Sequence, residues 1–133
     1  MNPILRNILA VVAGLLIGGA INSLIILMSG SLIAPPSGVD VNDVESIRAN
    51  IHLYEPKHFL MPFLAHAIGT LVGAFAAIKI GANNHMRLGL IVAVFFLVGG
   101  IIAATMIPAP TWFIALDLVI AYLPMAYIAY KLS

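Results

Sequence analysis

The sequence predicts an all-α integral membrane protein, a four-transmembrane-helix bundle with a short amphipathic helix on its outer surface. The first observation is composition: of 133 residues, 62% are apolar and only 8% are charged, whereas a soluble domain carries roughly 25% charged residues. Six basic and five acidic side chains cannot cover a water-soluble body of this size. The composition therefore excludes a soluble enzyme, a nucleic-acid-binding protein and a disordered chain.

The second observation is the distribution of the apolar residues. They form four stretches long enough to cross a bilayer, for which a helix needs about 20 residues. The predicted spans cover residues 4–28, 59–80, 88–107 and 112–132. Together they make one transmembrane domain, residues 1–133, built as two tandem helical hairpins. The lipid bilayer is thus the first expected partner.

The first span carries one basic residue near its start, Arg6. Its apolar run is about twice the length of the hydrophobic segment of a signal peptide. We therefore expect a retained signal anchor that spans the membrane.

The orientation follows from the positions of lysine and arginine, which are enriched on the cytoplasmic side. An antiparallel arrangement brings four basic residues to one side: Arg6, Lys79, Arg87 and Lys131. The opposite side holds two, Arg48 and Lys57, among four acidic residues. The sequence therefore predicts a bacterial inner-membrane protein with both termini in the cytoplasm.

The loop between the first two spans, residues 29–58, is expected outside and contains its own helix. Residues 34–38 (Ala-Pro-Pro-Ser-Gly) form a turn-rich stop. Asn42, with Glu45 three residues later, resembles a capping box at a helix start. Apolar residues then recur at helical spacing until Pro56. This amphipathic helix is interpreted as a structural cap, with a substrate-gating lid as the alternative.

The two hairpins resemble each other in sequence. Residues 16–21 (Leu-Ile-Gly-Gly-Ala-Ile) match residues 97–102 (Leu-Val-Gly-Gly-Ile-Ile), and residues 63–65 (Phe-Leu-Ala) match residues 113–115 (Phe-Ile-Ala). Both hairpins enter from the same side, so a duplication would be a parallel internal repeat. Apolar spans also match by chance, and both explanations stay open.

Small residues spaced for close helix packing occur in three of the four spans. Where lipid supplies no hydrophobic force between helices, small side chains allow two backbones to approach. The predicted packing residues are Gly14, Gly18, Gly69, Gly73, Gly99 and Gly100. These faces are expected to pack within the chain, and at least one is a candidate interface of a homo-oligomer.

A few polar residues lie inside the spans, and antiparallel threading places them at similar depth in the outer half of the bilayer. They are Asn22, His66, Thr70, Thr105 and Asp117. Asp117 is the one acid within a span, and an unpaired carboxylate there costs at least about 2.5 kcal/mol. His66 is the expected partner by type and depth. The cluster is interpreted as a polar clasp between helices, with an ion or proton pathway, a ligand site, or a metal or catalytic site as alternatives.

Other chemistry has weak support in the sequence. There is no cysteine, which excludes disulfides, thiolate metal sites and iron–sulfur clusters. His52, Glu55 and His58 are possible metal ligands by type, but their spacing matches no strong motif. Signatures of metalloproteases, nucleotide-binding loops and serine hydrolases are absent. We therefore expect no metal, no cofactor and no enzymatic activity.

The segment from Pro62 to Ala74 resembles small bacterial four-span membrane proteins, a likeness that implies the fold and no particular activity. Two functions stay open. The favoured one is a non-enzymatic membrane subunit or scaffold, acting as a homo-oligomer or within a larger membrane complex through its small-residue faces. The alternative is a small oligomeric channel or transporter with a polar vestibule around His66 and Asp117. No nucleic-acid partner is expected.

Overall fold

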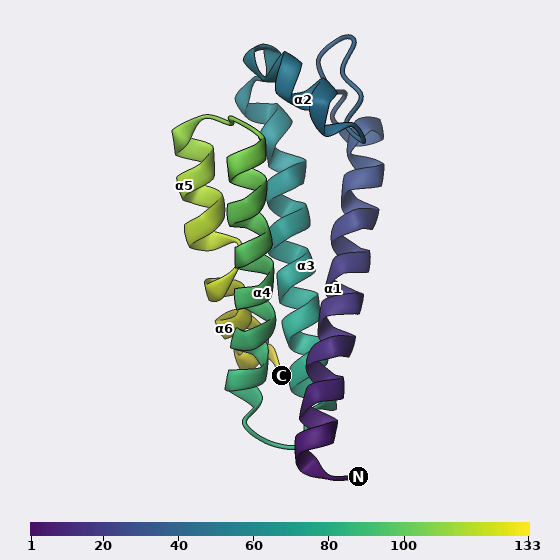
Figure 1. Cartoon of the computed structure of the whole chain (residues 1–133), viewed down its shortest axis with the longest axis vertical. Helices are drawn as coiled ribbons and strands as arrows, with labels where there is room; N and C mark the ends of the chain where they lie inside the picture. Colours follow the sequence, from purple (N-terminus) through teal and green to yellow (C-terminus); the bar gives the residue numbers. More distant parts are fainter.

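A computed structural model describes all residues, 1–133, and is helical throughout, without a strand (Figure 1). Four helical segments are long and apolar enough to cross a membrane. These are α1 (Pro3–Leu32), η2 (Pro56–Phe59) with α3 (Leu60–Ile80), α4 (His85–Met106), and α5 (Thr111–Ile120) with α6 (Leu123–Leu132). The all-helical class and the presence of four such segments are thus confirmed.

Helix α1 is longer than expected and contains 30 residues. Asn2 caps its start, because the side-chain oxygen accepts a hydrogen bond from the Ile4 N–H at 2.8 Å. The helix continues past residue 28 because the Ser29 hydroxyl is satisfied within it, donating to the Ile26 carbonyl at 2.6 Å. It ends at Leu32, shortly before two consecutive prolines, which disfavour helical backbone in the residue before them.

The fourth segment differs from the single helix expected over residues 112–132. Helix α5 stops at Ile120 and α6 starts at Leu123, and the intervening Tyr122 has non-helical dihedrals (φ −121°, ψ −81°). Pro124 explains the break, because it has no N–H to donate to the Ile120 carbonyl and its ring clashes with that turn. The apolar pattern predicted one unbroken helix because it takes no account of this proline.

The outer loop contains α2 (Val44–Asn50), followed by the short η1 (Ile51–Leu53). The expected cap is wrong by one residue. The Asp43 carboxylate, rather than Asn42, accepts from the Glu45 N–H at 3.1 Å. Asp43 is the better cap because the Asn42 N–H is already turned back to Asp40. Helix α2 lies across one end of the molecule (Figure 1), where the Arg48 Nε donates to the Met106 carbonyl of α4 at 2.8 Å.

Helices α1 and α3 meet along what we call the glycine seam: Gly14 and Gly18 of α1 against Gly69 and Gly73 of α3. A Cβ added at Gly18 would lie 2.5 Å from the Gly69 carbonyl oxygen, and one at Gly73 would lie 2.6 Å from the Gly14 carbonyl oxygen. Such distances leave no space for any side chain. The small residues of the first hairpin therefore pack against each other within the chain.

The glycines of α4 behave differently. A Cβ at Gly99 would meet nothing within 4 Å, so Gly99 does not pack against another helix of the same chain. Gly100 is buried, but its neighbour is the Tyr122 side chain rather than a helix backbone. Gly18 and Gly99 occupy matching places in the two similar segments, yet only Gly18 lies in a seam. The sequence likeness therefore does not extend to packing.

Small side chains fill the interior, and large ones cover the outside. The main buried cluster consists of Ala10, Ala74, Ala77, Ile78, Leu88, Val92, Ala93, Ala126 and Ala129. By contrast Leu16, Phe95 and Val119 are 70%, 58% and 67% exposed. A water-soluble domain buries its large apolar residues first, so this surface is suited to an apolar surrounding.

The start of α1 is tied to the turn between α3 and α4, at the end of the molecule opposite α2 (Figure 1). The Arg6 Nε donates to the Ile80 carbonyl at 2.6 Å, and the Asn7 side-chain oxygen accepts from the Ala82 N–H at 2.8 Å. Tyr130, in the last helix, lines a shallow pocket with Arg87. Both termini and the α3–α4 turn thus lie in the same half of the molecule.

Candidate functional site

The structure brings His66 of α3 and Asp117 of α5 into contact. The His66 Nδ1 lies 2.8 Å from Oδ1 and 3.0 Å from Oδ2 of Asp117. The Asp117 side chain is 7% exposed and that of His66 is 26% exposed. An ionised carboxylate only accepts hydrogen bonds, so Nδ1 is the donor and the second ring nitrogen, Nε2, stays free for another partner. The pair therefore joins a buried acid to a ring whose second nitrogen has no partner within the chain.

Tyr122 completes this contact and was missed in the sequence. Its hydroxyl donates to the Asp117 Oδ2 at 3.2 Å, and its ring stacks on His66 with centroids 5.9 Å apart. On an unbroken helix, residues five apart point about 140° away from each other. The break before Leu123 allows the phenol to reach the acid. Pro124 was the signal that could have indicated this.

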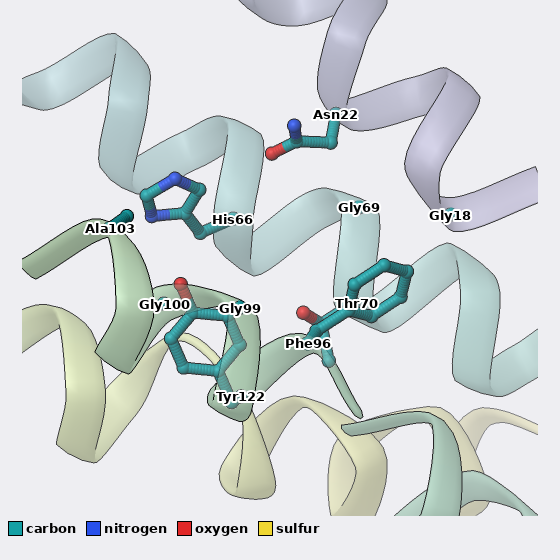
Figure 2. A pocket seen from close by; sticks show the side chains of 10 residues that line it. All are labelled: Gly18, Asn22, His66, Gly69, Thr70, Phe96, Gly99, Gly100, Ala103 and Tyr122. Carbon is teal, nitrogen blue, oxygen red and sulfur yellow. The ribbon is translucent and has the colours of Figure 1, made fainter. Parts of the chain in front are cut away.

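A polar cavity of about 200 Å³ lies beside the pair, between α1, α3 and α4 (Figure 2). Its lining residues are Gly18, Asn22, His66, Gly69, Thr70, Phe96, Gly99, Gly100, Ala103 and Tyr122. The Asn22 side chain faces His66 across this space (Figure 2). Thr70 is 1% exposed, and its hydroxyl has no hydrogen-bond partner. Thr70 thus borders the cavity, while its unpartnered hydroxyl is itself enclosed by protein atoms.

A second cavity, also about 200 Å³, lies beneath the outer loop and is mostly apolar. Its lining residues are Ile26, Ser29, Ile33, Pro35, Val41, Ile47, Ile51, Tyr54, His58, Phe59, Met61, Pro62, His66, Ala103 and Ile107. Burial raises the pKa of the Tyr54 phenol above its usual value, which keeps this side chain uncharged. His66 and Ala103 line both cavities, so His66 stands at their boundary.

Neither cavity is lined by a lysine, arginine, aspartate or glutamate. Asp117 is covered by His66 and Tyr122 and does not itself reach either space. In a low-dielectric surrounding, a carboxylate is stable when an opposite charge or proton balances it. Apart from the covered Asp117, the lining therefore offers hydrogen-bonding groups without a permanent charge.

Thr105 does not join the cluster, and its predicted membership is wrong. Its side chain is exposed, and the hydroxyl donates to the Ile102 carbonyl of its own helix at 2.6 Å. A threonine in a helix can satisfy its hydroxyl on the preceding turn, so depth alone does not bring it inward. Of the five predicted polar residues, four surround the cavity or the pair: Asn22, His66, Thr70 and Asp117.

The weak metal candidates do not form a site. No group of three His, Cys, Asp or Glu side chains could hold a metal ion. Instead, the His58 Nδ1 accepts from the Glu55 N–H at 2.8 Å, and the two residues cap the start of η2. The Glu55 carboxylate also lies 3.4 Å from the Lys57 Nζ. These side chains serve the turn into α3, and His52 belongs to a different short helix.

No protein-family model, no curated protein and no solved structure matches the chain, so its function is inferred from the geometry of the site.

Proposed function

We propose that the chain is a bacterial inner-membrane protein whose four apolar segments span the bilayer as a four-helix bundle. The exposed leucine, isoleucine, valine and phenylalanine side chains on the spanning helices support this, because lipid is the medium in which such a surface is stable. The orientation has both termini in the cytoplasm. Arg6, Lys79 and Arg87 lie together at the α3–α4 turn, in keeping with the positive-inside rule.

Within that membrane protein, the geometry favours a non-enzymatic channel or transporter subunit that works through His66 and Asp117. One observation carries the proposal. His66 is held by a buried acid through one nitrogen and borders two cavities with the rest of its ring. Histidine changes charge near neutral pH, and intramembrane His and Asp side chains commonly mark proton relays. A proton bound at this pair can accompany a solute that enters the cavity.

The test is proton flux into liposomes that contain the full chain, followed with an internal pH dye under an imposed potential. Asp117→Asn and His66→Gln should each reduce the flux at least tenfold, because each removes a proton-binding group. Thr105→Val is the matched control, since this polar residue lies at similar depth but outside the cluster. Equal flux in all three variants would refute the proposal.

A scaffold or homo-oligomer subunit is the second candidate, and a separate observation favours it. Helix α1 has two glycines, Gly19 and Gly30, at which an added Cβ would meet nothing within 4 Å. These two positions on α1 therefore stay uncovered after the glycine seam is formed. If a second copy packs on this side of α1, Gly19→Leu should lower the mass measured in mild detergent. Leu24→Ala, at an exposed position about 140° around the same helix, should not. A monomeric unmodified chain would exclude the homo-oligomer.

A further inference from the structure

The polar cavity and the apolar cavity follow one another along the same gap. Both have walls from α1 and α4, and both meet His66 of α3 and Ala103 of α4. The polar cavity reaches inward to Gly18, while the apolar cavity reaches outward to Ile47 of α2. Together they form what we call the binding track. Its inner end is polar and its outer end is apolar.

The inner end contains polar atoms that need a partner. The Thr70 hydroxyl is buried without a hydrogen bond, and a buried unsatisfied group destabilises a protein by about 1–3 kcal/mol. The Asn22 amide faces the same space (Figure 2), and His66 has one ring nitrogen left after its contact with Asp117. A molecule that both donates and accepts hydrogen bonds would satisfy this set.

The outer end has the size and surface for an apolar group. Ten of its fifteen lining residues are hydrophobic. A dry apolar cavity of about 150 Å³ already accommodates benzene, and this one measures about 200 Å³. Its roof comes from Val41, Ile47 and Ile51 of the outer loop. An alkyl chain or ring fits this end better than a hydrated solute.

The absence of charged side chains from the lining limits which polar head group a ligand can have. The lining of the binding track includes no residue with a permanent charge, and Asp117 is covered by its two partners. An ionic group brought here would lose its water without a counter-charge, which is costly in a low-dielectric site. A hydroxyl or carbonyl has no such penalty.

We propose that the binding track holds an uncharged, lipid-soluble molecule with a hydroxyl or carbonyl head. The head lies among Thr70, Asn22 and His66, and the apolar body lies beneath α2. This deepens the proposed function by naming its ligand class, and it depends on the same cavity but not on proton movement. Gly99, beside which there is open space, borders the polar end and provides a lateral entrance from the lipid.

The experiment uses the full chain in nanodiscs and a dodecanol derivative with a photoreactive diazirine at the end of its chain. Cross-links are located by peptide mass spectrometry. Labelling should saturate, and it should concentrate on the residues of α2 and η1 that cover the apolar cavity, such as Ile47 and Ile51. Unlabelled dodecanol should compete at least tenfold better than dodecanesulfonate or dodecyltrimethylammonium, which have the same chain and a charged head. Labelling that never saturates, or equal competition by the charged compounds, would overturn the proposal.

Three variants locate the site. Ala103→Phe fills the place where the two cavities meet and should abolish saturable labelling, whereas Ile102→Phe, on the exposed side of the same helix, should not. Thr70→Val removes a hydroxyl at nearly constant volume and should weaken binding about fivefold. The same change should stabilise the empty protein, because it removes an unsatisfied group. A purely structural Thr70 would instead leave binding unchanged, and that result would contradict the assignment of the head position.

The outcomes separate this inference from the transport proposal. Saturable binding of dodecanol without Asp117-dependent proton flux would refute transport alone. Asp117-dependent flux in a protein that shows no saturable labelling would refute the ligand site alone.

Discussion

The two helical hairpins share short sequence matches, but their helices pack differently. In the first, α1 and α3 touch through their backbones along the glycine seam. In the second, α4 faces a broken helix, and the Tyr122 side chain stands between Gly100 and the break. The glycine seam leaves no space between the two backbones, and the polar cavity opens beside it, at Gly18 and Gly69. The second hairpin keeps a buried acid and a phenol at the helix break, where the Tyr122 side chain lies against Gly100.

The candidate site uses both hairpins. His66 comes from α3, the helix fixed by the glycine seam, while Asp117 and Tyr122 come from the interrupted segment. The tightly packed hairpin thus sets the position of the histidine, and the looser one supplies the groups around it. Stability and chemistry should therefore respond to substitutions in different hairpins, and the predictions below test this division.

The largest effect is expected in the glycine seam. Gly18→Ala places a Cβ 2.5 Å from the Gly69 carbonyl oxygen and should destabilise the fold by about 3 kcal/mol, the upper end of the usual range for overpacking. Gly19→Ala, one residue along, meets open space and should be neutral or slightly stabilising, since alanine favours helix. Unfolding by sodium dodecyl sulfate in mixed micelles measures both. Equal stability of the two variants would show that Gly18 does not lie in a close helix contact.

The next effect concerns the contact between the hairpins. His66→Ala and Asp117→Ala should each destabilise the protein, and the double variant should lose less than the sum by about 1 kcal/mol, because the two side chains share one interaction. The same micelle titration gives the coupling. Strict additivity would mean that the pair does not hold the hairpins together.

A smaller effect is expected within the second hairpin. Tyr122→Phe removes the 3.2 Å hydrogen bond to Asp117 and should cost about 0.6 kcal/mol, the average for such bonds in membrane proteins. Tyr127→Phe, half-exposed on the same segment, serves as the control and should leave the unfolding curve unchanged. A loss of stability of the same size in both variants would show that the hydrogen bond from Tyr122 to Asp117 does not stabilise the protein.

The last effect has the opposite sign and compares two threonines of similar depth. Thr70→Val should stabilise the empty protein by about 0.5–1 kcal/mol, because the buried hydroxyl has no partner. Thr105→Val should stay within about 0.5 kcal/mol of the original, as expected for a surface position. A loss of stability in Thr70→Val would contradict this, because it would mean that the Thr70 hydroxyl has a hydrogen-bond partner.

The sequence indicated how deep each residue lies within its apolar segment, but not which side of the helix faces the interior. Hydropathy located the four apolar segments, and counting residues from their ends brought His66 and Asp117 to the same level. The same counting placed Thr105 in the cluster, because it cannot say which side of a helix turns inward. The spans are apolar all round, so no amphipathic pattern marks an inner face.

The contact between Tyr122 and Asp117 depends on a local break in the helix, which the apolar pattern does not indicate. Its phenol reaches Asp117 because Pro124 interrupts the helix. A single proline inside an apolar stretch outweighed the regular spacing that predicted one helix. Cavities likewise arise from how three helices meet, and no property of one segment indicates them.

The unequal lengths of the helices have a mechanical consequence. At 1.5 Å per residue, α1 measures about 45 Å, while α3 and α4 measure about 32 Å, close to the roughly 30 Å hydrocarbon thickness of a bilayer. In a membrane, α1 alone has a hydrophobic mismatch, which a helix relieves by tilting. Its inner end is fastened to the α3–α4 turn through Arg6 and Asn7, so the tilt must be taken up at its outer end. That end forms one wall of the gap above His66, and bilayer thickness would therefore set how wide this gap stands.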